Sequence, residues 1–233
     1  ISNDLTQGGK KGNVAFGTLT TIAESPAQFG FLYTGSDDGY IHRSENGGGS
    51  WDRISDDLPQ DLWVSRVIAS EHQKERVYVT LNGYRNDDFA AYVYVSEDRG
   101  ISWKSINKNL PNSPVNVIRE DPNNDQILYL GNDQGVYVSF DQGQKWQPFN
   151  KGLTTAAVHD LVVQPEANHL LVGTHGRSIY KADLAPFQKL NNAFLKQELA
   201  LLDPEKVKHS KLWGSSYSSV SYTHLRAHET DSY

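Results

Sequence analysis

Short runs of alternating or β-branched apolar residues, separated by polar turns, recur along most of the chain. They include FLYTG before SDDG and YIHRS, RVYVT before LNG and YVYVS, and ILYLG before NDQG and VYVSF. Two such runs joined by a turn rich in Gly, Asn and Asp are typical of a β-hairpin. The apolar positions of this region show no helical period. The pattern therefore predicts an all-β fold over residues 1–183.

Each predicted hairpin ends in the same short motif, Ser-x-Asp/Asn-x-Gly-x-x-Trp. The three copies begin 52 and then 43 residues apart, and each is followed by a short polar strand and an apolar strand that opens the next unit. Four strands in a unit of this length are the period of a β-propeller blade. The motif residues are Ser44, Asn46, Gly48 and Trp51, then Ser96, Asp98, Gly100 and Trp103, then Ser139, Asp141, Gly143 and Trp146.

We expect this motif to be structural rather than catalytic. A short carboxyl or amide side chain in a tight turn accepts hydrogen bonds from the backbone of the same turn. The glycine allows a positive φ angle, and the tryptophan ring packs against neighbouring strands. Asn46 keeps the acceptor oxygen of the aspartates without their charge, so the first turn is expected to form as well.

Four blades are predicted, over residues 17–56, 63–108, 113–150 and 157–183, the last of them without the motif and without a fourth strand. The first residues, ISNDLT, match ISDDLP at Ile54 and INKNLP at Ile106, and residue 1 is Ile rather than Met. We therefore expect residues 1–183 to be the end of one blade plus about four blades. Such a set is an arc of a larger ring, and the chain a fragment of a longer protein.

Residues 184–213 are predicted to form a linker with a short helix. Phe194, Leu195, Leu199 and Leu202 fall on one helical stripe that Pro204 ends. Residues 214–233 break with every earlier pattern, and we expect a non-native or disordered tail there.

Composition excludes several classes of function. The chain has 22 Lys and Arg against 28 Asp and Glu and no basic stripe, which argues against nucleic-acid binding. Its mean hydropathy is −0.58 and no long apolar run offers a membrane span. Cysteine is absent, and no Gly-rich phosphate loop or metal-ligand spacing occurs, so we expect neither cofactor nor metal.

Asp121, Asn123 and Asp125 resemble the start of a Ca²⁺ loop, but Gln126 and Asn132 break that pattern, which favours a turn.

The three motifs are Asp-boxes, and the chain resembles the Asp-box, or bacterial neuraminidase repeat, β-propellers. The resemblance is greatest to sortilin-like bacterial propellers often labelled glycosyl hydrolases, and HGRSIY at His175 looks like their closing blade. It implies a secreted, periplasmic or surface location for the longer protein. The arginine triad of sialidases and the Cys-rich module of sortilin receptors are missing. Because Asp-boxes occur in proteins of many activities, the resemblance implies a scaffold rather than a reaction.

Candidate binding residues lie on the face opposite the Asp-boxes, where the loops between second and third strands gather. The loop at residues 82–91 is the longest, and extra excursions of this kind often carry binding groups. Thr20, Ser65, Asn116 and His159 align in the first strands and are expected to line a channel mouth. The predicted ligand contacts are Tyr84, Arg85, His159, His175 and Arg177.

Two functions from different classes remain open. The first is a non-catalytic propeller that binds a carbohydrate, protein or peptide, the peptide in the channel if its wall is apolar. The alternative is a glycoside hydrolase, which needs two carboxylates about 5–10 Å apart. Candidates for that pair are Asp37, Asp38, Asp87, Asp88 and Asp133, although turn aspartates more often bind their own backbone. Trp63 and Tyr84 would stack on the sugar.

Overall fold

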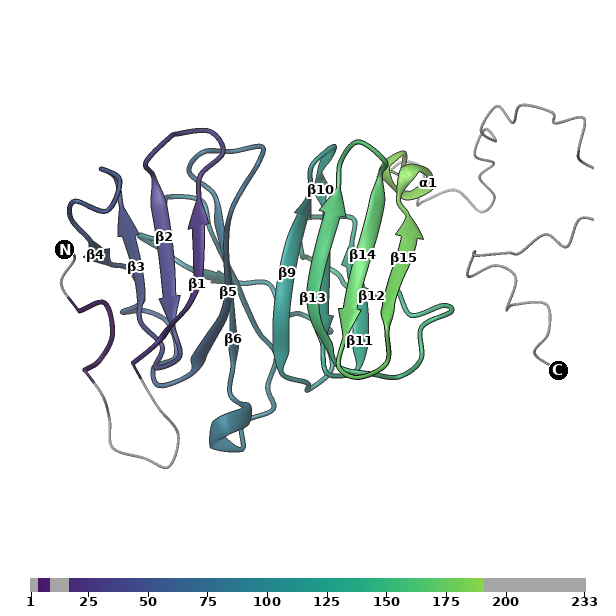
Figure 1. Cartoon of the computed structure of the whole chain (residues 1–233), viewed down its shortest axis with the longest axis horizontal. Coiled ribbons are helices and arrows are strands. Elements are labelled where there is room, and N and C mark those ends of the chain that lie inside the picture. Colours follow the sequence, from purple (N-terminus) through teal and green to yellow (C-terminus); the bar gives the residue numbers. More distant parts are fainter. Residues whose placement is uncertain (1–3, 9–16, 191–233) are drawn as a thin grey trace, which may run out of the picture.

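The computed structural model describes residues 4–8 and 17–190, which form four antiparallel β-sheets (Figure 1). Blade 1 contains β1 (Leu19–Glu24), β2 (Leu32–Ser36), β3 (Ile41–Ser44) and β4 (Asp52–Arg53). Blade 2 contains β5 (Trp63–Ala69), β6 (Val77–Asn82), β7 (Tyr92–Ser96) and β8 (Lys104–Ser105). Blade 3 contains β9 (Val115–Asp121), β10 (Asn124–Asn132), β11 (Gly135–Ser139) and β12 (Gln147–Pro148). Blade 4 contains β13 (Val158–Gln164), β14 (His169–Thr174) and β15 (Ile179–Asp183).

Within each sheet the strands follow one another in sequence order, so every blade is a simple meander. The predicted all-β fold with four-stranded blades is confirmed, as are the three strands of the last blade within the described residues. A 3₁₀ helix, η1 (Tyr84–Asn86), interrupts the β6–β7 connection, and a short helix, α1 (Ala185–Gln188), follows β15. The helix expected around residues 194–202 and the tail at 214–233 lie outside the described residues. No helix in the described part of the chain is long and apolar enough to cross a membrane.

The first strand of every blade contains a β-bulge at the same place. The register against the second strand shifts at this place in β1, β5, β9 and β13, and the pairing of β9 with β10 shifts a second time between Asn124 and Leu128. A bulge leaves one residue without a partner in the neighbouring strand, which re-aims its side chain. The four extra residues are Thr20, Ser65, Asn116 and His159.

Three of these four residues fasten one blade to the next. Thr20 Oγ1 donates to the Val64 carbonyl at 2.7 Å, and Ser65 Oγ donates to the Val115 carbonyl at the same distance. Asn116 Nδ2 donates to the Val158 carbonyl at 3.1 Å. The alignment of the polar residues is therefore correct, but their polar atoms bond to the neighbouring backbone instead of being offered to a ligand.

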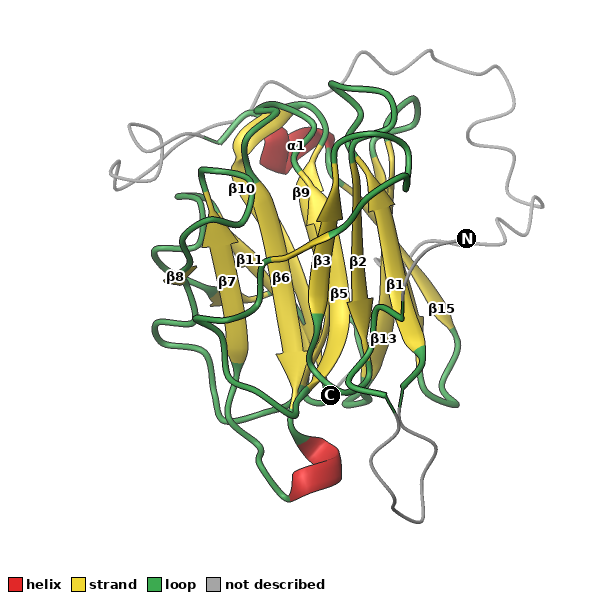
Figure 2. Ribbon diagram, turned by 90° about the vertical axis from the view of Figure 1, so that its left-hand side faces the viewer, coloured by secondary structure: helices red, strands yellow, loops and turns green. Residues whose placement is uncertain are grey.

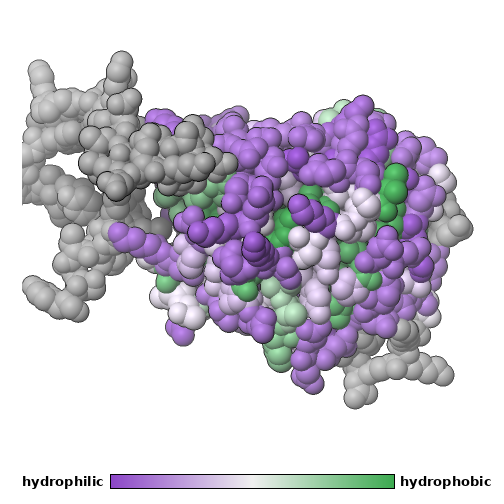
Figure 3. All heavy atoms as spheres, turned by 180° about the vertical axis from the view of Figure 1, so that it is seen from behind, coloured by the Kyte–Doolittle hydropathy of each residue, from purple (hydrophilic) through white to green (hydrophobic). Residues whose placement is uncertain are grey.

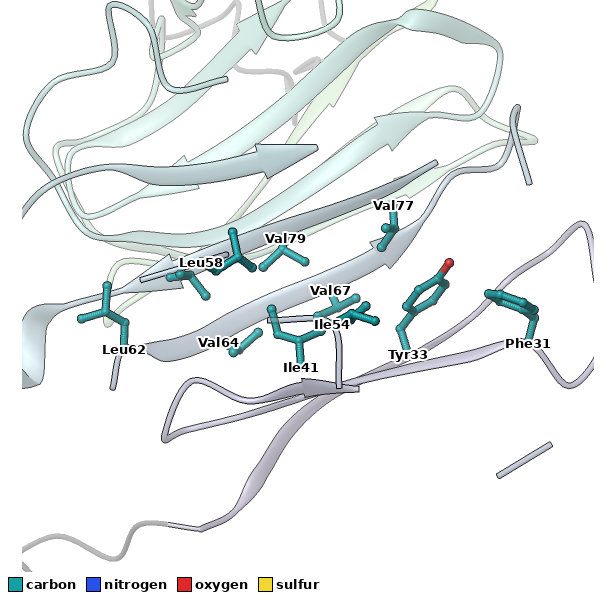
Figure 4. Close-up of a cluster of buried hydrophobic side chains, with 11 residues drawn as sticks. Phe31, Tyr33, Ile41, Ile54, Leu58, Leu62, Val64, Val67, Val77 and Val79 are labelled. Atoms are coloured by element: carbon teal, nitrogen blue, oxygen red, sulfur yellow. The ribbon is translucent and has the colours of Figure 1, made fainter. Parts of the chain in front are cut away.

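The same valines that accept these bonds fill the space between the sheets. The core between blades 1 and 2 joins Phe31, Tyr33 and Ile41 to valines of blade 2 (Figure 4). Val158 packs against Gly131 so closely that a Cβ atom at Gly131 would lie 2.6 Å from Val158 Cγ1. Glycine is thus required at position 131 by the approach of the next blade, since its φ angle is not positive.

The Asp-box turns provide a second contact between blades. In the third copy, Ser139 Oγ accepts from Gly143 N at 2.8 Å, and Asp141 Oδ1 accepts from Lys145 N at 2.9 Å. In the second and third copies the tryptophan donates from Nε1 to a carbonyl of the preceding blade, as Trp146 does to Ile106 at 2.6 Å, whereas Trp51 donates to Gly48 of its own turn. The motif therefore closes its own turn and, in its second and third copies, also bonds to the preceding blade.

We expect Gly131→Ala to lower the free energy of unfolding by about 1–3 kcal/mol, because the added methyl group overpacks the contact with Val158. Gly173 holds the equivalent position in blade 4, and there the nearest atom to a Cβ lies at an ordinary 3.5 Å. Gly173→Ala is the matched control, and its effect should stay within about 0.5 kcal/mol. Urea denaturation measures both. Equal losses in the two variants would contradict this account of the glycine.

A second expected outcome concerns acid stability. Burial opposes ionisation of Asp98, but hydrogen bonds from Ser102 and Ser96 outweigh it and lower the pKa of Asp98 below its ordinary value. A carboxyl group whose pKa is lowered by folding stabilises the protein above its unfolded pKa of about 3.9 and loses that contribution as pH falls through its folded pKa. The stability advantage of the wild type over Asp98→Asn should therefore be present at pH 7 and shrink below about pH 4. Thermal unfolding measured from pH 7 to pH 3 tests this, and a constant difference would contradict it.

Candidate functional site

The connections between second and third strands gather at one end of the molecule. They are residues 36–40, 83–91, 132–135 and 174–178, and we call this end the loop face. Each loop is held beside the start of its blade, as by the bond from His175 N to the Ala157 carbonyl at 2.8 Å. Figure 2 shows the longest connection, which carries η1, projecting past the strand ends at the end opposite α1.

Two aromatic rings are exposed on the long connection. The side chains of Tyr84 and Phe89 are 62% and 47% exposed, and their ring centroids lie 6.2 Å apart at an interplanar angle of 76°. This edge-to-face geometry is favourable for a pair of rings. We call Tyr84 and Phe89 the aromatic platform.

Backbone and side-chain bonds hold the platform in place. Asn82 Oδ1 accepts from Tyr84 N at 2.9 Å, and the Gly83 carbonyl accepts from Asp88 N at 3.1 Å. Asn86 Nδ2 reaches the Asp61 carbonyl in the link between blades 1 and 2 at 2.9 Å. The excursion is therefore an ordered feature of this face.

Arg85 joins the excursion to blade 1. Its guanidinium lies 5.1 Å from the centre of the Trp63 ring, and its Nη1 atom lies 3.2 Å from Asp37 Oδ2. The Asp37 side chain is buried, so this ion pair is sheltered on one side. Arg85 is thus partly committed to holding the loop, while Trp63 lies beneath it rather than on the open surface.

The candidate carboxylates mostly bind the protein itself. Asp37 Oδ1 accepts from the backbone N–H groups of Gly17 and Thr18, both at 2.9 Å. Asp38 is buried and accepts from Ser36 Oγ and from Gln7 N, the latter at 2.7 Å. These two aspartates secure the first strand and the N-terminal link to blade 1.

The remaining three carboxylates differ in exposure. Asp88 Oδ2 accepts from the Tyr92 hydroxyl at 2.7 Å, and this bond together with burial raises the pKa of Tyr92 to about 12. Asp133 Oδ1 accepts from Asn116 Nδ2 at 2.8 Å. Asp87, the C-cap of η1 with a φ angle of 57°, is the exposed member of the five.

The predicted ligand contacts form two groups. Tyr84 and Arg85 lie together on the excursion of blade 2, and Phe89, which the sequence placed in the excursion but not among the contacts, joins them. His159 and His175 lie on blade 4, where their exposed rings stack with centroids 5.0 Å apart. Arg177 is exposed on the same β14–β15 loop.

A hollow of about 400 Å³ lies away from the loop face, where the ends of β1, β5, β9 and β13 approach one another. Apolar side chains such as Ile68 and Val162 share its wall with Glu71, Arg119 and Glu120. Its wall is therefore mixed rather than apolar. Within the described residues, no group of three His, Asp or Glu side chains is placed to hold a metal ion.

Residues 91–191 match the sequence profile of the family described as Sortilin, neurotensin receptor 3. Among solved structures, a GH74 xyloglucanase from Xanthomonas campestris aligns with a TM-score of 0.59 at 17% identity, covering 73% of this chain and 30% of its own. A GH74 enzyme from Niastella koreensis aligns with a TM-score of 0.61 at 15% identity, covering 73% of this chain and 29% of its own. An ancestral GH74 enzyme aligns at 0.54 and 20% identity, covering 70% of this chain and 22% of its own. No curated protein sequence matches the chain.

The sheets and these likenesses define the class of protein, a β-propeller. The match over residues 91–191 shows that this part of the chain is similar to the sortilin family, which confirms the resemblance drawn from the sequence. The chain spans at most 30% of the length of the three similar structures. At identities of 20% or less they establish the fold alone.

We expect Asp37→Ala to lower the free energy of unfolding by about 2–4 kcal/mol, because it leaves two backbone N–H groups and a half-buried guanidinium without their acceptor. Asp87→Ala removes a carboxylate of the same size from the exposed tip and should change stability by less than about 0.5 kcal/mol. Chemical denaturation of both variants separates the two roles. A small effect of Asp37→Ala would show that Asp37 is not an anchor and reopen it as a functional group.

Proposed function

We propose that this protein is a ligand-binding propeller scaffold that uses the aromatic platform on its loop face, and that the ligand is a carbohydrate. The observation that carries the proposal is the pair of exposed rings, Tyr84 and Phe89, on an ordered excursion. Two exposed rings in contact on an ordered loop form an apolar surface on which a partner can pack, unlike a single exposed side chain. The match to the sortilin family supports an extracytoplasmic location for the longer protein.

The chemistry around the platform suits a sugar ring. Aromatic faces pack on the apolar C–H faces of pyranose rings, while hydroxyl groups at the rim need donors and acceptors. Asp87 is an exposed acceptor next to the platform, and the Arg85 guanidinium supplies donors at its base. Bonds to Asn82 and Asp61 fix the excursion before binding, which reduces the entropy cost of association.

The alternative, glycoside hydrolysis at this face, has support of a different kind. The similar structures are named as GH74 enzymes, one of them a xyloglucanase. Against it, Asp37, Asp38, Asp88 and Asp133 accept hydrogen bonds from the protein's own groups. A hydrolase needs one carboxyl group free to give up a proton and a second free to attack or to activate water. We therefore place binding ahead of hydrolysis.

The platform predicts the effect of two substitutions on binding. Tyr84→Ala and Phe89→Ala should each weaken binding of xyloglucan oligosaccharides about tenfold or more, because central aromatic contacts dominate the energy of such sites. Phe29→Ala is the matched control, since Phe29 is 96% exposed on the β1–β2 turn at the other end of the molecule. Isothermal titration calorimetry on a panel of soluble polysaccharides gives the affinities.

Two results would contradict the proposal. One is equal binding by the wild type and both platform variants, and the other is an absence of binding across the panel. A reducing-end assay on the same samples tests the alternative. Release of sugar by the wild type that is lost in Asp87→Ala, with Phe29→Ala unchanged, would establish a hydrolase instead of a binding protein.

A further inference from the structure

A hollow lies at the rim of the molecule between blades 2 and 3. Its volume is about 430 Å³, and its walls come from β8, from the adjoining parts of β6 and β7, and from the Asp-box turn of blade 3. Blades 2 and 3 each pack against a blade on both sides, so further blades before blade 1 or after blade 4 would leave this hollow as it is. Figure 2 shows β8 at the outer edge of its sheet, beside β7.

Two arginines fill the equivalent space between blades 1 and 2. The Arg99 guanidinium lies 5.0 Å from the centre of the Phe31 ring, and Arg43 Nη1 donates to the Arg99 carbonyl at 3.1 Å. A Glu45 carboxylate oxygen lies 3.6 Å from Arg43 Nε and 3.9 Å from Arg99 Nη1. The rim is therefore closed between these two blades.

Shorter side chains stand at both of these places between blades 2 and 3. Val95 corresponds to Arg43 in the register of the sheets, and Gln142 corresponds to Arg99 in the Asp-box motif. Gln142 turns back to its own blade, where its Nε2 atom donates to Asp125 Oδ2 at 3.3 Å. The hollow is open because neither side chain reaches across it.

The hollow has an apolar floor and a cationic wall. Val95 and Ile106 line it and are buried, whereas Lys104 and Lys108 line it and are exposed. Neither lysine forms an ion pair with a carboxylate of the residues that the structure describes. Glu97, the carboxylate in the same wall, already pairs with an arginine of blade 2 at 2.9 Å. The hollow therefore has room for an apolar group beside two cations that have no acidic partner.

The strand β8 also presents backbone groups that are free to pair. Ile106 N donates to the Val93 carbonyl at 2.9 Å, and along an antiparallel strand such residues alternate with residues whose backbone groups point the other way. Ser105, opposite Tyr94, therefore directs its N–H and carbonyl groups away from β7. In the described part of the chain no strand pairs with this side of β8. Pro148 holds the corresponding position in β12, where it removes the N–H group from the edge.

We propose that this rim site binds an extended acidic peptide segment of a partner protein, which adds a strand to β8. The peptide backbone pairs with Ser105, and alternate side chains of the peptide enter the hollow. A carboxylate of the peptide pairs with Lys104 or Lys108, which gives the contact complementary charge. An apolar side chain of the peptide packs on Val95 and Ile106. This site is separate from the aromatic platform and takes a ligand of a different class.

The test uses the whole chain and the peptide Thr-Glu-Thr-Val-Thr-Glu-Thr, labelled with fluorescein at its N-terminus and amidated at its C-terminus. Its glutamates and valine lie on one side when it is extended, and its sequence reads the same in both directions, so it suits a strand of either orientation. The same peptide with lysine in place of glutamate is the comparison. Fluorescence anisotropy should show saturable binding of the glutamate peptide by the wild type, and binding of the lysine peptide at least about tenfold weaker.

Two substitutions copy features that other blades already contain. Ser105→Pro removes the free N–H group, as Pro148 does in blade 3, and should weaken binding of the glutamate peptide at least about tenfold, whereas Ser105→Ala keeps that group and is the matched control. Gln142→Arg introduces the residue that closes the rim between blades 1 and 2, at a φ angle of 56° against 63° for Arg99. It should weaken binding about tenfold although it adds a positive charge. Circular dichroism confirms that each variant is folded.

A third substitution tests the charge of the site. Lys104→Gln should weaken binding of the glutamate peptide by about threefold to tenfold. Lys145 is exposed on the Asp-box turn of blade 3 and does not line the hollow, so Lys145→Gln makes the same change of charge and should leave binding unaltered.

Four results would overturn the proposal. The first two are an absence of saturable binding by the wild type and equal binding by Ser105→Pro and Ser105→Ala. The third is tighter binding by Gln142→Arg than by the wild type, which would show attraction by charge without use of the hollow. The fourth comes from polygalacturonate as a second probe. If Lys104→Gln weakens its binding and Ser105→Pro does not, the site belongs to an acidic polysaccharide instead of a peptide.

Discussion

Each pair of neighbouring blades is joined by two contacts of one valine. Its carbonyl group accepts a hydrogen bond from the preceding blade, and its side chain packs against that blade. Val64, Val115 and Val158 each place an apolar side chain against the preceding sheet while their carbonyl groups accept a bond from its bulged residue. A β-sheet whose fourth strand is only two residues long has little stability alone, so its faces must be covered by other sheets. The packing side chain and the accepting carbonyl belong to the same residue. The two contacts therefore set the distance and the angle between the blades together. The loop face inherits its geometry from this contact, since every loop begins at the end of a second strand, which is paired with the start of the first strand.

The repeating strands and turns of this structure could be predicted well from the sequence, whereas the contacts between neighbouring blades could not. Period, turn glycines and tryptophans identified the blades, because local patterns determine hairpins and tight turns. The alignment of Thr20, Ser65 and Asn116 was found, but the acceptors of their bonds lie 42 to 50 residues further along the chain. Such partners depend on how two sheets pack, which no local pattern contains.

The candidate carboxylates show the same limit at the site. Asp37 and Asp87 both lie in polar loops beside a second aspartate, and nothing in their neighbours along the chain distinguishes them. In the folded protein Asp37 is enclosed by the start of β1 and by Arg85, while Asp87 caps η1 in solvent. The aromatic platform was partly predictable, since an excursion with two aromatic residues stands out from the repeat. From behind, the surface is mainly hydrophilic with separate hydrophobic spots (Figure 3).

The excursion at residues 83–91 leaves the sheet beneath it undisturbed. β6 and β7 pair without a break from Val77 opposite Ser96 to Leu81 opposite Tyr92, although the chain departs for nine residues between them. The pairing of β6 with β7 is therefore independent of the loop, and the length or sequence of the loop can change without altering that pairing. New recognition properties can arise at this position through insertion and replacement alone, and a laboratory could introduce foreign loops there without redesigning the blades.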